Sequence, residues 1–309
     1  MPAFEDLTAP LGRAEFASEY WLSHPATLRP RTRLLEPLLL DKRMLSAPAL
    51  IDAGHDEFRI LPRKHELIHA GGGREALLAW KSELEVTLVA EYSQITLDSV
   101  RSFCMGLIQS IRVPFGWSLP NLYYSRPGSG FTRHWDNHEN FIIGLSGTKR
   151  FLLAPNRCVR FPLQNADNYY PHVKGFEARI EAERIADNLP GTIQIDVGPG
   201  DCIFIPRGWW HEASALEGDS VTLTWAVWTS TWADLFKTAG IEPPEAATEL
   251  ALRTPLPLSP ADVPDDLHLP THLANALEMP RVQAELLSIA NVTKDWKRGL
   301  ETGRAQSLG

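Results

Sequence analysis

The sequence NLYYSRPGSGFTRHWDNHENFIIGLSGTKRFLLAP, residues 121–155, is the stretch that decides the fold. It contains short apolar runs separated by turn residues, and the runs FIIGL and RFLLAP flank Ser-Gly-Thr at 146–148, which predicts a hairpin. Residues 198–228, GPGDCIFIPRGWWHEASALEGDSVTLTWAVW, continue the pattern, and 220–228 alternate threonine with larger apolar residues. Short strands joined by turns predict a mainly β fold, an antiparallel sandwich or barrel of the jelly-roll kind.

Helical segments are expected on both sides of these strands. Residues 74–92 have a helix-forming composition, and the apolar residues from Leu97 to Ile111 are spaced for one face of an amphipathic helix. Residues 254–270 contain five prolines and indicate an extended linker, whereas 281–300 place apolar residues on one helical face. The chain is therefore divided into an N-terminal helical or mixed region at 1–115, a β domain at 116–230 and a C-terminal helical extension at 231–309.

The composition is that of an ordinary globular protein. The 309 residues are 44% hydrophobic and 22% charged, and the net charge of -8 argues against general nucleic-acid binding. Three widely separated cysteines support neither a disulfide framework nor a Cys-x-x-Cys zinc site. The N-terminus lacks the pattern of a secretory signal, and the apolar run at 34–40 is too short to span a membrane. We expect a cytoplasmic protein without a membrane segment.

Two histidines and one aspartate within the β domain have the chemistry of a metal site. His134 and Asp136 are separated by one residue, so on a strand both side chains point to the same face. His211 follows an apolar segment and a Gly-Trp-Trp turn, where a neighbouring strand can supply a third ligand. Two imidazoles and a carboxylate form the facial triad that leaves positions open on Fe(II) for a cosubstrate and O2. Taken alone, the three residues also fit a surface His-x-Asp and an unrelated core histidine.

The surrounding motifs carry a more specific signal. The segment HWDNHENFIIGLSGTKRFLLAP resembles the cupin-type JmjC oxygenases that use Fe(II) and 2-oxoglutarate, and within them the ribosomal-protein hydroxylases and the asparaginyl hydroxylase group. GDCIFIPRGWWHEA is similar to their Gly-Asp-x-x-x-x-Pro-x-x-Trp-x-His segment, and NLYYSRPGSGF to the Asn-x-Tyr-x-x-x-Pro-Gly-Ser-x-Gly run of the ribosomal oxygenases. The resemblance covers roughly residues 120–228 and implies a cupin/JmjC double-stranded β-helix.

The resemblance also implies individual roles. His134, Asp136 and His211 would hold Fe(II), and Lys149, in a Gly-x-Lys-Arg setting, would meet the far carboxylate of 2-oxoglutarate. A surface lysine on a hairpin is the alternative for Lys149. The other positions that match cosubstrate or iron contacts are Tyr123, Thr224 with Thr222 as its fallback, and Asn140.

Some positions depart from the family pattern. Phe131 stands where the asparaginyl hydroxylases have a cosubstrate-binding threonine, which favours the tyrosine-based arrangement and Tyr123. The Pro-Gly-Ser-Gly turn is one residue shorter than in most ribosomal oxygenases, which affects the register of Tyr123. A fourth ligand would occupy an open metal position, so His138 is interpreted as a residue of the pocket rim rather than a ligand.

Further candidates surround the site. The connection at 156–190 is long for a compact domain and carries Tyr169, Tyr170 and His172, so it either covers the barrel mouth or is a surface loop with a short helix near 176–185. Core packing is favoured over substrate stacking for the nearby tryptophans. The tryptophans expected to pack in the core are Trp135, Trp209 and Trp210. Trp117 and Arg133 are candidate substrate contacts near the mouth of the barrel.

These observations predict an Fe(II)/2-oxoglutarate-dependent dioxygenase, with 2-oxoglutarate and O2 as cosubstrates. The resemblance implies a hydroxylated side chain of a protein or peptide substrate. A free amino acid or other small molecule is the alternative within the class. A non-catalytic cupin-type binding protein and a zinc hydrolase on the same ligands are alternatives from other classes. Family analogy and the apolar face at 281–300 suggest a homodimer.

Overall fold

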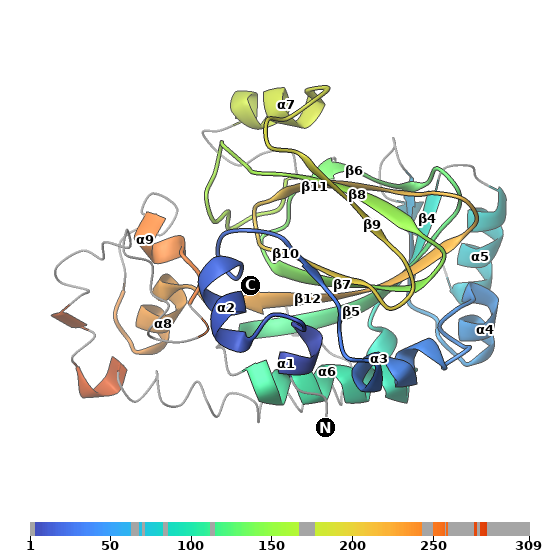
Figure 1. Ribbon diagram of the computed structural model, residues 1–309, viewed down its shortest axis with the longest axis horizontal. Helices are drawn as coiled ribbons and strands as arrows, with labels where there is room; N and C mark the ends of the chain where they lie inside the picture. Colours follow the sequence, from blue (N-terminus) through green and yellow to red (C-terminus); the bar gives the residue numbers. More distant parts are fainter. Residues whose placement is uncertain are drawn as a thin grey trace.

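The computed structural model describes residues 4–62, 68–69, 72–82, 86–111, 115–166, 177–242, 250–256, 258, 275–276 and 279–282. Two antiparallel sheets form the centre of the molecule (Figure 1). Within the described residues, the larger sheet has eight strands in the order β1-β10-β7-β12-β5-β4-β2-β3, and the smaller has four in the order β6-β11-β8-β9. The strands of the larger sheet are β1 (Ala26–Leu28), β10 (Cys202–Ile205), β7 (Glu139–Ser146), β12 (Ser220–Thr229), β5 (Phe115–Ser125), β4 (Val86–Ala90), β2 (Phe58–Pro62) and β3 (Ile68–His69).

The smaller sheet lies against one face of the larger sheet. Apolar residues from both sheets form the cluster between them, including Ile142 on the larger sheet and Phe151 and Leu153 on the smaller. This face-to-face arrangement confirms the predicted jelly-roll core. The strands of the smaller sheet are β6 (Gly130–His134), β11 (Trp210–Ala215), β8 (Lys149–Ala154) and β9 (Ile193–Val197).

Helices cover the outer face of the larger sheet, and α1, α3 and α6 lie beneath it in Figure 1. The apolar face of α6, which includes Leu107 and Ile111, belongs to the largest buried cluster, as its spacing predicts. Helix α7 lies on the side of the smaller sheet, and α8 and α9 lie at one end of the molecule. The helices are α1 (Phe4–Leu7), α2 (Arg13–Glu19), α3 (Thr32–Leu39), α4 (Ala47–Asp52), α5 (Gly73–Ser82), the 3-10 helix η1 (Ser93–Ile95), α6 (Asp98–Ile111), α7 (Glu177–Ile185), α8 (Trp232–Thr238) and α9 (Leu250–Arg253).

Successive side chains of the larger sheet alternate between the apolar core and a cavity on the opposite face. In β12, Leu223, Trp225 and Val227 belong to the core between the larger sheet and the helices, whereas Thr222 and Thr224 line a cavity between the sheets. Since successive side chains of a strand point to opposite faces, apolar residues on one face and polar residues on the other follow from the sequence period. The same rule places Leu122 and Tyr124 of β5 in the core and Asn121 and Tyr123 in the cavity.

The predicted hairpin at 146–148 is wrong. Strand β7 lies between β10 and β12, so both of its edges are already hydrogen-bonded, and β8 instead pairs with β11 and β9. The chain therefore crosses from one sheet to the other at Gly147, which has a φ of 62°. A Cβ at this position would lie 2.2 Å from the carbonyl oxygen of Asp219, so the crossing requires glycine.

The expected helix at 74–92 is half right. Residues 73–82 form α5, but Val86–Ala90 form strand β4, which pairs with β5 and is buried along its whole length. The β-branched and apolar run VTLVA favours a strand once a neighbouring edge is available. Strands β1 to β4 of the N-terminal region therefore extend the larger sheet, and the boundary at 115 stays a prediction.

Several expectations concern residues outside the described part of the chain. Tyr169, Tyr170 and His172, most of the expected linker at 254–270 and nearly all of the helix at 281–300 belong there, as does the side chain of Trp117. The short helix expected near 176–185 is present as α7. Among the described helices, none has the length and apolar character needed to cross a membrane. Cys104, Cys158 and Cys202 are buried and unpaired.

Candidate active site

A cavity of about 350 Å³ lies between the two sheets. Its walls come from β5, β7 and β12 of the larger sheet, from β6, β8 and β11 of the smaller, and from Arg59 and Val89 on β2 and β4. Polar side chains converge on an otherwise apolar enclosure, which is typical of a small-molecule site. All seven site residues predicted from the sequence line it, namely Tyr123, His134, Asp136, Asn140, Lys149, His211 and Thr224.

His134, Asp136 and His211 form a compact group of metal-ligand type. One ligand atom from each residue lies within 4.8 Å of the other two. His134 ends β6 and is directly opposite His211 on β11, with 4.1 Å between the ring centroids. Asp136 follows the end of β6, and its Oδ2 is 3.4 Å from Nε2 of His211. Strand pairing therefore brings together the two histidines, which are distant in the sequence, and the turn after β6 adds the carboxylate.

Backbone carbonyls orient both imidazoles of this group. Nδ1 of His134 lies 2.8 Å from the carbonyl oxygen of Thr132, and Nδ1 of His211 lies 2.9 Å from that of Trp209. A carbonyl oxygen only accepts hydrogen bonds, so each Nδ1 carries the proton and donates. Nε2 is then the nitrogen of each ring with a lone pair for a metal, as is usual for histidine ligands held by a second hydrogen bond.

The carboxylate of Asp136 is held in its charged form. Burial by itself raises the pKa of Asp136, but the nearby imidazoles of His138, His211 and His134 outweigh burial and lower it well below its usual range. Asn140 donates from Nδ2 to Oδ2 of Asp136 at 2.7 Å. An ionised, oriented carboxylate beside two Nε2 atoms fits a divalent cation of the Fe(II) type, and a triad of this composition leaves positions open on such a cation.

Lys149 is a buried cation near this group. Its side chain is fully enclosed at 1% exposure, and Nζ donates to Oγ of Ser125 at 2.8 Å. The ammonium also lies 4.9 Å from the ring centre of Phe131 and 5.7 Å from that of Tyr123. In the described part of the chain no carboxylate reaches it, and burial lowers the pKa of Lys149 to about 7. A buried ammonium without a counter-ion fits an anionic ligand.

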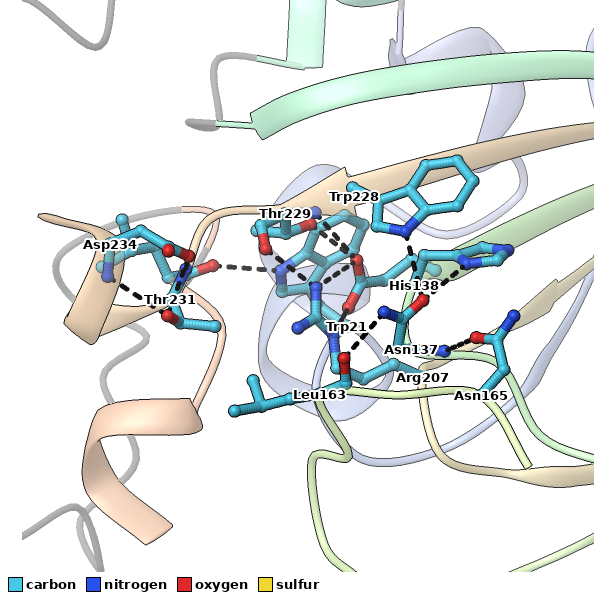
Figure 2. A network of polar contacts seen from close by, with 12 residues as sticks. Trp21, Asn137, His138, Leu163, Asn165, Arg207, Trp228, Thr229, Thr231 and Asp234 are labelled. Carbon is cyan, nitrogen blue, oxygen red and sulfur yellow. Dashed lines mark hydrogen bonds and ion pairs between the residues drawn. The ribbon is translucent and has the colours of Figure 1, made fainter. Parts of the chain in front are cut away.

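The remaining predicted residues surround the space between Lys149 and the metal group. Tyr123 packs edge-on against Phe131 with 5.2 Å between ring centroids, and burial raises the pKa of its hydroxyl, which keeps it a donor. Thr222 and Thr224 both line the cavity, so the geometry does not choose between them. His138 is a wall residue, with 3.9 Å between its ring centroid and that of Trp228 (Figure 2).

Other candidates do not join the cavity. Arg133 instead donates to the carbonyls of Glu183 on α7 and of Ala186 directly after it, and pairs with Glu212. Arg133 is not among the residues that line the cavity, and its role as a substrate contact stays a prediction. Trp135 and Trp210 are buried in a separate apolar cluster, as core packing predicts, and Trp209 donates to the carbonyl of Ser23.

Some residues that line the cavity, such as Arg59 and Asn165, or that support it, such as Ser125 beneath Lys149, were not predicted from the sequence. Ser125 is two residues after Tyr123 on β5, so strand alternation was sufficient to place it on the same face. Asn165 belongs to the long connection, and its Oδ1 accepts from the backbone N–H of Asn137 at 2.8 Å (Figure 2). Arg59 is on β2, whose position beside β4 has no local signal in the sequence.

Residues 105–235 match the family model described as the JmjC domain. YxbC of Bacillus subtilis is 26% identical over 71% of this chain and 68% of its own length. A protein of Aedes aegypti named bifunctional lysine-specific demethylase and histidyl-hydroxylase NO66 is 30% identical over 38% of this chain, but the match spans only 17% of that protein. The solved structure of ycfD from E. coli aligns with 97% of this chain and 74% of its own, at 18% identity and a TM-score of 0.50, and shares the fold.

Proposed function

We propose that this protein is an Fe(II)- and 2-oxoglutarate-dependent dioxygenase that hydroxylates a side chain of a protein or peptide, a proposal supported by the match of residues 105–235 to the JmjC domain model. The observation that carries the proposal is the pairing of two sites in one cavity. His134, Asp136 and His211 supply a metal group, and Lys149 supplies a buried cation that no carboxylate reaches among the residues that the structure describes. Iron bound by this triad and a cosubstrate with two carboxylates satisfy both sites at once.

The residues of the chain divide the work of binding. His134, Asp136 and His211 hold the metal, and Asn140 keeps the carboxylate of Asp136 in place. Lys149 and the protonated hydroxyl of Tyr123 bind the far carboxylate of 2-oxoglutarate, and Ser125 fixes the ammonium. When bound, Fe(II) with 2-oxoglutarate and O2 supplies the oxidation of a substrate C–H bond to C–OH while the 2-oxo acid becomes succinate and CO2. Phe131 and Trp228 provide apolar walls that restrict water.

The substrate class is inferred from a named relative. The NO66 relative is named for histidyl hydroxylation and lysine demethylation, which are both oxidations of amino-acid side chains. This similarity supports a protein or peptide substrate, and a free amino acid or other small molecule is the alternative. A cytoplasmic location and a homodimer through the C-terminal helices are further proposals, and light scattering that shows a monomer would refute the second.

The test of the proposed function starts without substrate. Anaerobic addition of Fe(II) and 2-oxoglutarate is expected to produce a weak visible charge-transfer band that is absent in His134→Ala. Peptides from a cell extract, incubated with enzyme, Fe(II), 2-oxoglutarate and O2, are then searched by mass spectrometry for the addition of one oxygen atom. Normal folding without a band or succinate would support a binding protein instead. Turnover with Zn(II) and no oxygen consumption would support a hydrolase.

A further inference from the structure

A buried ion pair lies next to the metal group but does not belong to it. The carboxylate of Glu139 is fully buried, and the side chain of Arg207 is 4% exposed. Arg207 donates to both carboxylate oxygens, from Nε at 2.7 Å and from Nη2 at 3.2 Å. Thr229 completes the arrangement, because its hydroxyl donates to Glu139 at 2.7 Å and its carbonyl accepts from Arg207 at 2.8 Å. The charges are thus fully paired.

The pair joins the two segments that carry the metal ligands. Glu139 is three residues after Asp136, at the start of β7, and Arg207 is four residues before His211, in the turn between β10 and β11. The same turn touches the ligand segment directly, since the N–H of Gly208 donates to the carbonyl of Asp136 at 2.8 Å. A displacement of Arg207 therefore moves the turn that is hydrogen-bonded to Asp136 and leads into His211.

The end of β12 attaches to the same place. Trp228 donates from Nε1 to Oδ1 of Asn137 (Figure 2). The hydroxyl of the adjacent Thr229 donates to Glu139, so two neighbouring residues of β12 bind the segment that follows Asp136. Asn137 is also tied to the long connection through Nδ2, which donates to the carbonyl of Leu163 at 2.9 Å. The ion pair therefore lies where three chain segments meet, namely the segment after Asp136, the turn between β10 and β11, and the end of β12.

Stability alone is a weak explanation for this pair. Removing two charges from water costs several kcal/mol per ion, and well-packed apolar replacements of a buried pair are often as stable or more stable. A bidentate guanidinium, in contrast, fixes both distance and orientation between the segments that it joins. Metal ligands need such support, because a small displacement of one ligand weakens binding.

We propose that the Glu139–Arg207 ion pair is a positioning device that holds the Asp136 segment and the turn leading to His211 at the spacing required for metal binding. Both residues act through the ligands and touch neither metal nor cosubstrate. The inference rests on the metal group of the proposed function. It states that the affinity of this group for a metal depends on the Glu139–Arg207 ion pair, which is not part of the group.

The decisive variant is the double replacement Glu139→Gln with Arg207→Met. It removes both charges together, and the glutamine keeps an acceptor for Thr229. The melting temperature is expected to stay within about 3 °C of wild type, because no unpaired charge is buried. The affinity for Co(II), measured by calorimetry under anaerobic conditions, is expected to fall about 10- to 100-fold. The visible absorption of bound Co(II) is expected to change as well, since it reports ligand geometry.

Two further variants separate positioning from general destabilisation. Leu107→Ala creates a cavity in the core beneath the larger sheet, so it is expected to lower the melting temperature and leave Co(II) affinity and absorption unchanged. Arg207→Lys keeps both charges but loses the bidentate guanidinium. Its affinity for Co(II) is expected to lie between those of wild type and the double variant. If the double variant does not fold, Arg207→Lys is used in its place to test the inference.

The inference would be overturned if the folded double variant bound Co(II) with wild-type affinity and absorption. If the double variant does not fold, the same result in Arg207→Lys would overturn it. In both cases the proposed function would stand. Failure of the wild-type protein to bind Co(II) at all would overturn both. Loss of affinity in Leu107→Ala as large as in the double variant would also overturn it, because affinity would then follow stability alone.

Discussion

The ammonium of Lys149 donates to the hydroxyl of Ser125 at 2.8 Å, and Ser125 is in turn 2.9 Å from Oγ1 of Thr87. This chain of neutral partners fixes the position of the ammonium without neutralising its charge. The cation is thus held in place for an anion that the described residues do not supply. Ser125 and Thr87 come from the paired strands β5 and β4, so a strand outside the matched JmjC segment supports the proposed cosubstrate site.

The stability of the ligand-free protein is expected to depend on pH through Lys149. Burial lowers its pKa from 10.5 to about 7 in the folded state, so between these values the unfolded chain binds more protons than the folded chain. The free energy of unfolding therefore rises with pH across this window. Lys149→Met is expected to remove that rise in urea titrations at pH 7 and pH 9. An equal rise in wild type and variant would contradict the assignment to Lys149.

Lys149→Met is also expected to separate cosubstrate binding from metal binding. Loss of a charge-assisted bond to a carboxylate corresponds to about 1.5 to 3 kcal/mol, which is roughly 10- to 150-fold in affinity. Calorimetry with Co(II)-loaded protein is expected to show this loss for 2-oxoglutarate and an unchanged affinity for Co(II). The exposed Lys42→Met is the control for loss of a positive charge. Equal effects of the two substitutions would exclude a specific role for Lys149.

Asn140→Ala is expected to weaken metal binding without unfolding the protein. The amide of Asn140 donates to Oδ2 of Asp136 at 2.7 Å, and its removal leaves that carboxylate less well oriented. Loss of such a supporting hydrogen bond typically costs about 10- to 100-fold in metal affinity. Asn188→Ala, at an exposed position, serves as the control. Unchanged Co(II) affinity in Asn140→Ala would show that Asp136 does not depend on this amide.

Gly130→Ala is expected to disrupt the pairing that places His134 opposite His211. A Cβ at Gly130 would lie 1.9 Å from the carbonyl oxygen of Ala213 on β11, so the two strands must separate. We expect a lower melting temperature and loss of Co(II) binding. In Gly198→Ala the added Cβ meets its nearest atom at 3.6 Å, and near-normal behaviour is expected. Normal Co(II) binding in Gly130→Ala would show that the strands adapt.

Local patterns in the sequence were sufficient for much of the site. The period of two in 220–228 predicts a strand with threonines on one face, and the structure turns that face toward the cavity. The spacing of His134 and Asp136 made them candidate ligands, but the assignment of these two residues and His211 to one metal site also required the family resemblance. Lys149 required the family resemblance, because nothing in its own segment shows that it is buried.

Pairings between distant segments were not predictable in this way. The hairpin at 146–148 failed because β10 and β12 occupy both edges of β7, and both of those strands come more than fifty residues later. The acceptors of Arg133, the carbonyls of Glu183 and Ala186, come from a segment at least fifty residues later, and no local pattern in the sequence indicates them. Whether VTLVA becomes helix or strand depends on an available sheet edge at β5.

The sequence by itself determined the chemistry of this protein, because the residue types and the two-residue period of each strand select which side chains face inward together. The tertiary structure alone decided how that chemistry is held. The contacts of Lys149 with Ser125, of Glu139 with Arg207 and of His134 with His211 join residues far apart in the chain. Such contacts form only when burial of the two apolar sheet faces brings those segments together, and no local pattern records that packing.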